Sequence, residues 1–432
     1  MERVLVAFPT PWDQRQLDAC RRRWEDHFEI AWGTPSDADC PADLDPVAWV
    51  EEAAERWSGR IDGVFVSSDY PGAILSAALA ERLGLPGPGV GAVLACAHKL
   101  AARRALAPVV PEATAACWPL DPARPDAPPP DGLAFPCFVK PVKGAYSVLA
   151  RRIDSAGDLA AFLARPEVAE FADFYLRIFR RALDAWGGPL ATEERASFVA
   201  EELLTGTQLT IEGWCADGRL GVLGIVDSVV HPTTRSFLRF DAPSTLPVEV
   251  QSRIVALTGR VIHRLPLERS VFNIELLWDA ERDRLSILEI NPRLCGQFAD
   301  LHDKVAGLNG YEVALALAVG EDPPPARGGS LAVAASVPLR VFEPVRVVAA
   351  PDAEAIAAAE RLHPATLVWS ECAAGDELVD FTTAEDGASA RYGVINLGAA
   401  DRPTLLDRAG RILDALGYRF EPAAPPRRAD FL

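Results

Sequence analysis

The chain has 432 residues, which is more than one hydrophobic core usually serves, so we expect two or three domains. Hydrophobic residues make up 49% and charged residues 24%, the composition of a soluble globular protein and not of a disordered one. The net charge of −18 argues against a nucleic-acid partner, and the lack of an apolar run of about 18 residues argues against a transmembrane helix.

The eight cysteines are scattered along the chain and include no CxxC pair. This spacing argues against a zinc site or a disulfide framework and favours reduced thiols in the cytosol. The first residues, MERVLVAFPTPW, have the pattern of a buried strand and lack the features of a signal peptide. We therefore expect a cytoplasmic protein.

Two residue types are scarce enough to be informative. The bias toward Ala, Pro and Arg indicates that arginine replaces lysine wherever bulk charge suffices, so the remaining lysines should mark sites that need a compact ammonium group. Of 43 basic residues, only four are lysine: Lys99, Lys140, Lys143 and Lys304. Asparagine is equally rare: Asn273, Asn291, Asn309 and Asn396.

The first elements predict a small parallel α/β domain. Residues 3–8 and 61–68 have the pattern of buried strands, with helical stretches between and after them. The first strand is followed by FPTPW and not by a glycine-rich turn, so we do not expect a dinucleotide site. A loop, a helix ending in a Gly/Pro stop and a second helix that contains Lys99 come next.

The middle of the chain predicts strands on both sides of a helical segment. A Pro-rich link over 119–136 leads to the strand PCFVKP, residues 158–198 are helical in two or three segments, and 198–204 is another strand. The stretch 208–230 predicts a hairpin closed by Asp217 and Gly218, and 271–293 predicts a further hairpin. Residues 321–329 form a linker, 331–420 alternate strands with two helices, and the C-terminal tail is expected to be mobile.

The second hairpin carries the strongest chemical signal. The period of two places Glu289 and Asn291 on one face of a strand, with Leu288 and Ile290 on the other. Glu275 lies on the neighbouring strand and is expected to point toward the same surface. Because two carboxylates and an amide oxygen are hard donors, this set suits magnesium.

Lysine at a strand end suggests a phosphate site. Lys140 closes the strand before the small-residue loop KPVKGAYS, where backbone N–H groups could add donors. Lys99, near the start of a helix, is a weaker signal that an exposed helical lysine would equally explain.

The chain carries in order Lys99, Lys140, a Glu-Glu-Leu-Leu segment, Glu275 and the run EINPR at 289–293. This ordered set resembles the ATP-grasp superfamily, above all its carboxylate–amine ligases of the L-amino-acid ligase and carnosine synthase type, and more distantly biotin carboxylase. The resemblance extends from about residue 60 to 320 and more faintly to 420. Its most specific part is the EINPR run with an acidic residue 14 positions upstream.

The resemblance implies an ATP-grasp fold of mixed α/β and α+β class. An N-terminal parallel α/β domain would span 1–95, the ATP-grasp core 96–325 with a lid at about 135–200, and a small C-terminal α+β domain with its tail 326–432.

The resemblance also implies roles for individual residues. Phosphate contacts would come from Lys99, Lys140, Lys143 and Ser147, and adenine would lie near Glu201, Glu202 and Leu204. Two magnesium ions, with manganese as an alternative, would be held by Glu275, Glu289 and Asn291. Arg293 would face the γ-phosphate and the acceptor carboxylate and stabilise the developing acyl phosphate.

The chain departs from the family pattern in two places. Gln208 stands where the family often has glutamate for the ribose hydroxyls, and it can still form hydrogen bonds there. Tyr146 and Leu149 stand in the phosphate loop where the resemblance predicts glycine.

The substrate is the least determined part. In similar ligases the segment after the first hairpin lies beside the substrate, so His231, Arg235 and Arg239 are candidates for binding an anionic acceptor. The role of Lys304 is left open: it could contact the substrate or form a local salt bridge.

The resemblance implies an ADP-forming ligase that joins a small carboxylate to an amine through an acyl phosphate. A biotin-carboxylase-like enzyme and a nucleotide-binding regulatory protein without turnover are the alternatives. The cofactors would be ATP and Mg²⁺. The partners would be two small molecules, with no nucleic acid or membrane. The oligomeric state stays open, with a homodimer as one candidate.

Overall fold

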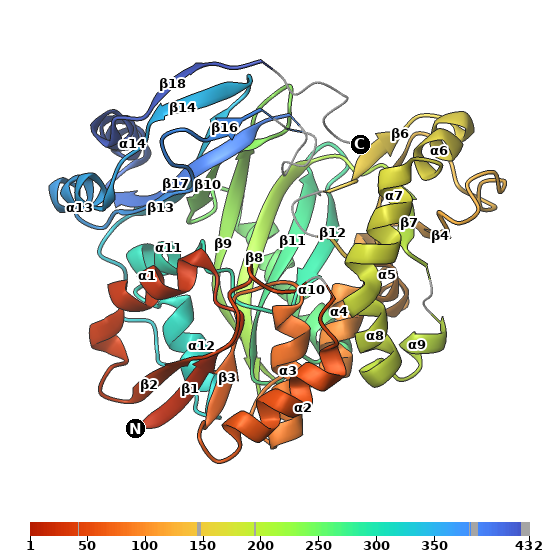
Figure 1. Cartoon of the computed structure of the whole chain (residues 1–432), viewed down its shortest axis with the longest axis horizontal. Helices are drawn as coiled ribbons and strands as arrows, with labels where there is room; N and C mark the ends of the chain where they lie inside the picture. The colour runs from red at the N-terminus through yellow and green to blue at the C-terminus, as the bar shows by residue number, and fades with distance from the viewer. Residues whose placement is uncertain (42, 145–147, 194–195, 380, 382–387, 425–432) are drawn as a thin grey trace.

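The computed structural model describes residues 1–41, 43–144, 148–193, 196–379, 381 and 388–424. The chain begins with a three-stranded parallel sheet in the order β2-β1-β3 (Figure 1). Its strands are β1 (Glu2–Val6), β2 (Phe28–Trp32) and β3 (Gly63–Phe65), joined by α1 (Pro11–Ala19), the short η1 (Arg21–Arg23) and α2 (Pro46–Trp57). Helix α3 (Gly72–Leu83) follows β3 and is buried along most of its length.

The parallel α/β character predicted for this region is confirmed, but strand β2 was missed. Its residues FEIAW are buried only in part because β2 lies at the edge of the sheet. An edge strand of this kind shows no continuous apolar run, so the sequence pattern does not reveal it.

The middle of the chain adds a second sheet, antiparallel, in the order β4-β7-β5-β6. Helices α4 (Val90–Ala97) and α5 (Lys99–Leu106) and the short η2 (Pro111–Ala113) precede it. Its strands are β4 (Cys117–Leu120), β5 (Cys137–Pro141), β6 (Arg151–Ile153) and β7 (Phe198–Glu202), and the helical insertion consists of α6 (Ala156–Leu163), α7 (Pro166–Glu170), η3 (Phe171–Tyr175), α8 (Leu176–Trp186) and α9 (Leu190–Glu193).

An eight-stranded sheet forms the centre of the molecule, in the order β12-β11-β8-β9-β10-β13-β17-β15 (Figure 1). Its strands are β8 (Thr207–Ala216), β9 (Arg219–Val230), β10 (Phe237–Ala242), β11 (Ser270–Asp279), β12 (Arg284–Asn291), β13 (Val333–Val341), β15 (Leu367–Ser370) and β17 (Ala390–Ala399). Both predicted hairpins are confirmed, and the first is closed by Asp217 and Gly218, each with positive φ. Helix α10 (Val248–Arg264) connects β10 to β11, and α11 (Ala299–Ala306) and α12 (Gly310–Ala318) follow β12.

The last part of the chain confirms the predicted alternation of strands with two helices. A small sheet in the order β16-β14-β18 contains β14 (Val345–Ala349), β16 (Glu377–Leu378) and β18 (Arg419–Pro422), and the helices are α13 (Ala353–Leu362) and α14 (Arg402–Leu416). Strands β13, β15 and β17, however, extend the central sheet.

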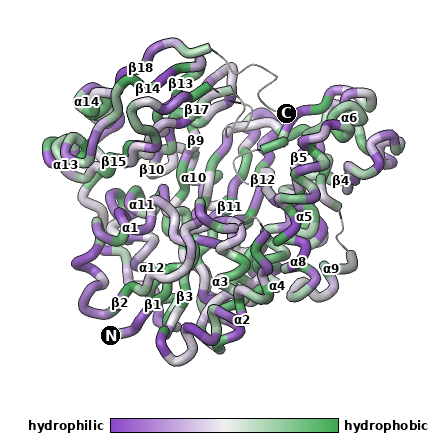
Figure 2. The backbone as a smooth tube through the Cα atoms, in the orientation of Figure 1, coloured by the Kyte–Doolittle hydropathy of each residue, from purple (hydrophilic) through white to green (hydrophobic). Residues whose placement is uncertain are grey.

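The largest hydrophobic core joins α3, α4 and α10 to strands β8, β11 and β12. Hydrophobic residues are concentrated along α3 and α4 in Figure 2, where both helices are buried. This core supports the hairpin β11–β12 from the side opposite its acidic residues. None of the helices in the described residues is long and apolar enough to cross a membrane.

Candidate functional site

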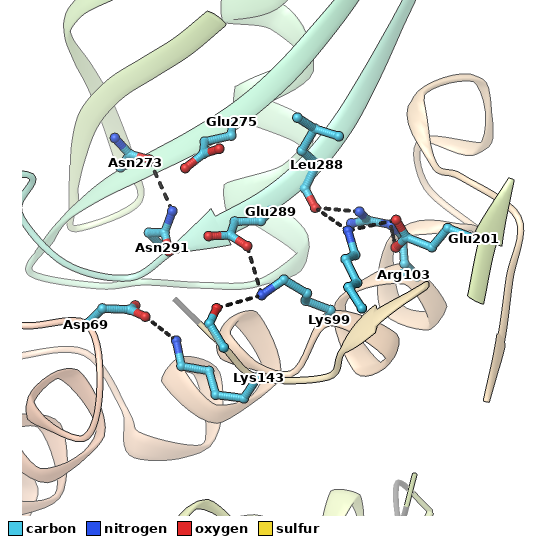
Figure 3. Close-up of polar contacts among 12 residues, drawn as sticks. Asp69, Lys99, Arg103, Lys143, Glu201, Asn273, Glu275, Leu288, Glu289 and Asn291 are labelled. Carbon is cyan, nitrogen blue, oxygen red and sulfur yellow. Dashed lines mark hydrogen bonds and ion pairs between the residues drawn. The ribbon is translucent and has the colours of Figure 1, made fainter. Parts of the chain in front are cut away.

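The hairpin β11–β12 brings the predicted metal ligands together. Glu275 lies opposite Glu289 in the register, and Asn273 lies opposite Asn291. Directly opposed residues project from the same face of a sheet, with Cβ atoms about 4.5–5.5 Å apart. The carboxylates and the amide therefore share one face, as Figure 3 shows.

A β-bulge interrupts this hairpin beside the two glutamates. The pairing passes from Glu275 and Glu289 directly to Leu276 and Ile287, so Leu288 is the extra residue on β12. A bulge releases the polar groups of its extra residue from the ladder. The Leu288 carbonyl can therefore accept hydrogen bonds from side chains outside the sheet.

Arg103, Lys140 and Glu201 form a buried ion network against this carbonyl (Figure 3). Leu288 O accepts from Arg103 Nη2 at 2.5 Å and from Lys140 Nζ at 3.5 Å. Glu201 binds both cations, with Oε2 2.7 Å from Lys140 Nζ and Oε1 3.0 Å from Arg103 Nε. Burial lowers the pKa of Lys140, although the charge of Glu201 opposes this shift. Burial opposes ionisation of Glu201, but the two cations hold its pKa below the ordinary value.

Lys99 connects helix α5 to the hairpin. Its Nζ lies 2.8 Å from Glu289 Oε2 and donates to the Gly144 carbonyl at 3.3 Å. The helix begins here because His98 is its N-cap, with the imidazole accepting from the Ala101 N–H at 3.2 Å. Burial opposes protonation of Lys99, but the charge of Glu289 raises its pKa above the ordinary value. Lys99 is therefore a fixed cation beside the carboxylates.

Lys143 and Arg293 meet at Asp69. Lys143 Nζ lies 2.5 Å from Asp69 Oδ2, and Arg293 Nε lies 3.8 Å from Oδ1. Burial opposes ionisation of Asp69, but the charges of Lys143 and Arg293 outweigh it and hold the pKa of Asp69 at about 2. The N-terminal parallel sheet thus contributes an anion to the site.

The sequence analysis missed two residues of this cluster, Asp69 and Arg103. Asp69 follows β3 at the carboxyl end of a parallel strand, which is where α/β sheets bind ligands. Arg103 lies four residues after Lys99 in one helix, a spacing that places both on one helix face. Both signals were present in the sequence and could have indicated these positions.

The pKa values of the two hairpin glutamates shift in opposite directions. Burial raises the pKa of Glu275 to about 7, and the charge of Glu289 adds to the shift. Burial also opposes ionisation of Glu289, but the charge of Lys99 holds its pKa below the ordinary value. A divalent cation between these oxygens would relieve the repulsion, so the donor set fits magnesium. Among the described residues, no group of three or more His, Cys, Asp or Glu side chains is placed so that it could hold a metal ion, so Asn291 would complete the set.

Two of the predicted nucleotide contacts, Gln208 and Glu202, have partners within the protein. Gln208 Nε2 donates to Glu275 Oε2 at 2.9 Å, so its amide faces the hairpin carboxylates. Glu202 forms an ion pair with Arg284 at 2.7 Å, and Leu204 is partly buried in the connection between β7 and β8.

The phosphate loop is described only in part. Ser147 and Tyr146 lie outside the described residues. Leu149 has a φ of 55°, the left-handed region that favours glycine. The backbone therefore takes a glycine-like conformation where the resemblance predicted glycine.

The four predicted substrate residues have their contacts outside this cluster. The His231 ring lies 5.0 Å from the Phe342 ring, and Arg239 binds Asp241 with two hydrogen bonds of 2.6 and 2.9 Å. Arg235 is exposed in the turn between β9 and β10, and Lys304 forms a buried ion pair with Asp300. Their proposed role in substrate binding stays a prediction.

Neither a family model nor a curated protein matches the chain. Solved structures match it over nearly its whole length. The L-amino acid ligase from Bacillus licheniformis has a TM-score of 0.73 at 16% identity and covers 98% of this chain and 99% of its own. Phosphoribosylglycinamide synthetase from Anaerococcus prevotii has a TM-score of 0.64 at 13% identity, and the match covers 98% of this chain and 100% of the synthetase. Biotin carboxylase from Campylobacter jejuni has a TM-score of 0.62 at 14% identity, and the match covers 98% of this chain and 92% of the carboxylase.

These neighbours are ATP-grasp enzymes, and the chain has the ATP-grasp fold. The expected mixed α/β and α+β fold class is thereby confirmed.

Proposed function

We propose that the chain is an ATP-dependent carboxylate–amine ligase that works through an acyl phosphate and releases ADP and phosphate. The observation that carries this proposal is the convergence of cations from separate elements on one set of buried and half-buried carboxylates. These cations are Lys99, Arg103, Lys140, Lys143 and Arg293. Phosphoryl transfer requires such a charge cluster, and the fold shared with an L-amino acid ligase supports the ligase class.

In the proposed complex, the ATP phosphates would take over lysine hydrogen bonds that protein groups now accept. Lys99 and Lys140 would hold the phosphates from opposite sides, and Lys143 would contact them from the loop after β5. Arg293 would bind the acceptor carboxylate, where a guanidinium can offer two parallel hydrogen bonds. Adenine would lie beside Glu202 and Leu204.

Glu275, Glu289 and Asn291 would hold magnesium, two ions in our proposal, which neutralises charge on the β- and γ-phosphates. Burial and the charge of Glu289 raise the pKa of Glu275, and a bound cation would reverse this shift by favouring the ionised carboxylate. Manganese should substitute, because it also accepts carboxylate and carbonyl oxygens.

The reaction then needs no protein nucleophile. A carboxylate oxygen of the acceptor attacks the γ-phosphorus, a new P–O bond forms, and the bond to the departing ADP breaks. The amine nitrogen next attacks the acyl carbon, the C–N bond forms, and phosphate leaves with the electron pair of the C–O bond. The amine gives up its proton to solvent. Arg293 would stabilise the negative charge that develops at the acyl oxygen.

Measuring ADP and phosphate release from MgATP with panels of amino acids, other carboxylates, amines and bicarbonate tests the proposal. We expect release that depends on both a carboxylate and an amine, with a condensed product by mass spectrometry. Turnover only with bicarbonate and a biotin carrier would instead indicate a biotin-carboxylase-like enzyme. Nucleotide binding without turnover on any panel would indicate a regulatory protein.

Glu289→Ala tests the metal assignment within this function. We expect turnover to fall about 10³-fold or more, since metal stabilisation of the transition state is worth several kcal/mol, while the fold stays intact. Glu249→Ala, on the exposed surface of α10, is the matched control and should keep normal turnover. Near-normal activity of Glu289→Ala would show that the metal assignment is wrong.

A further inference from the structure

A line of buried hydrogen bonds runs from helix α11 to the predicted ligand Asn291. His302 Nε2 lies 2.6 Å from Glu212 Oε2, and Asn273 Nδ2 donates to Glu212 Oε1 at 3.2 Å. Asn291 Nδ2 in turn donates to Asn273 Oδ1 at 3.2 Å (Figure 3). All four side chains are buried, with exposed fractions of 1–3%. The line therefore connects three strands and one helix in a region closed to solvent.

The donor and acceptor order of this line fixes the orientation of the last amide. The Glu212 carboxylate accepts, so Asn273 presents its NH₂ group to Glu212 and its oxygen to Asn291. Asn291 must then present its own NH₂ group to Asn273. Its oxygen is left as the free end, on the face that Glu275 and Glu289 share. The opposite orientation would present an NH₂ group, which cannot bind a cation.

We propose that Glu212 and Asn273, supported by His302, are positioning residues that hold Asn291 with its oxygen toward the magnesium site. This inference rests on the proposed function, because it needs a metal at the hairpin. Residues that orient a metal ligand in this way are typically worth 10–100-fold in metal affinity or activity.

Gly224 makes this arrangement sterically possible. It lies opposite Glu212 in the register of β8 and β9. A Cβ at residue 224 would lie 2.6 Å from Nδ1 of the buried His302 ring. Gly224→Ala should therefore push the ring away from Glu212, although the substitution itself removes no polar group from the line.

The test measures Mn²⁺ binding by electron paramagnetic resonance to the full chain saturated with a non-hydrolysable ATP analogue. Asn273→Leu removes both hydrogen bonds and should weaken Mn²⁺ binding about 10–100-fold. Gly224→Ala should shift the affinity in the same direction. Glu212→Gln keeps an oxygen for Asn273 and should retain most of the affinity, which a loss of general packing would not explain.

Asn309→Leu is the matched control. Asn309 is equally buried, but it caps helix α12 by accepting from the Tyr311 N–H at 2.9 Å. Its loss should lower the melting temperature and leave Mn²⁺ affinity unchanged.

Wild-type Mn²⁺ affinity in folded Asn273→Leu or in Gly224→Ala would overturn the inference. If Asn273→Leu does not fold, the Mn²⁺ affinities of the other two variants decide the question. We expect Gly224→Ala to bind Mn²⁺ more weakly and Glu212→Gln to retain most of the affinity. Absence of Mn²⁺ binding to the wild-type nucleotide complex would instead contradict the proposed function, so the two failures are distinguishable.

Discussion

At the scale of single residues, every lysine of this chain lies inside the protein beside a carboxylate. Lysine is almost never fully buried unless it is paired, yet all four have exposed fractions of 8% or less. The pairs are Lys99–Glu289, Lys140–Glu201, Lys143–Asp69 and Lys304–Asp300. The scarcity of lysine in the composition thus marks positions where a buried ammonium group is required. Three of these four lie in the proposed ATP site.

Asp69 should make the stability of the protein depend on acid pH. Its folded pKa is about 2 and its ordinary value 3.8, so ionisation of Asp69 favours the folded state. This contribution is fully present above pH 3.8 and is lost as the pH falls through about 2. A shift of this size corresponds to about 2–3 kcal/mol at neutral pH. Urea unfolding of Asp69→Asn at pH 7 should show a loss of this order.

The difference in unfolding free energy between wild type and Asp69→Asn should narrow once the pH drops below about 4, because the Asp69 carboxyl of the unfolded wild-type chain then takes up its proton while that of the folded protein stays ionised down to about pH 2. Asp126→Asn, exposed in the loop before β5, is the control and should leave the unfolding free energy unchanged at both pH values. A difference that stays constant between pH 7 and pH 3 would show that charge at Asp69 is not the cause.

At the scale of elements, the bulge in β12 anchors a strand of one sheet to a strand of another. Lys140 lies on β5 and Glu201 on β7 in the four-stranded sheet, whereas Leu288 belongs to the central sheet. Arg103 adds helix α5 to the same point. Removing one member of such a buried network leaves uncompensated charge and costs more than removing a balanced pair.

Glu201→Gln should therefore destabilise the protein by about 3–5 kcal/mol, since Arg103 and Lys140 would face each other without an anion. Adding Arg103→Met to Glu201→Gln should recover part of this loss. Chemical denaturation of the two single variants and the double variant gives the coupling free energy. Additive losses would show that the three charges do not act as a unit.

At the scale of the whole molecule, the C-terminal region is a structural part of the central sheet. Strand β13 pairs with β10 and with β17, and β17 pairs with β15, so residues 333–399 take part in three of the seven strand pairings of this sheet. Removing this region would leave β10 with an unpaired edge. Exposed strand edges with hydrophobic residues tend to pair with other chains.

A chain ending at residue 329 should therefore aggregate or form oligomers, which size-exclusion chromatography would reveal. A chain ending at residue 424 removes none of the described residues and is the matched control. A monomeric 1–329 chain with a wild-type melting temperature would show that the sheet does not need β13. It would also favour the predicted domain boundary near residue 326.

Local sequence pattern by itself determined a large part of the proposed metal site. The alternation of β12 was sufficient to place Glu289 and Asn291 on one face, because the period of a strand is set by its own backbone, and the pairing within the hairpin adds Glu275 to that face. The Asp217–Gly218 turn was equally predictable, because both positions need positive φ.

Only the tertiary structure decided which distant residues meet this hairpin. Asp69, Arg103 and the extra residue Leu288 reach the site because three sheets and helix α5 pack around it. The local sequence pattern likewise did not predict edge strand β2 or the pairing of β13 with β10. The physical reason is that a residue's own strand fixes the face it occupies, whereas its neighbours across sheets depend on burial summed over the whole chain.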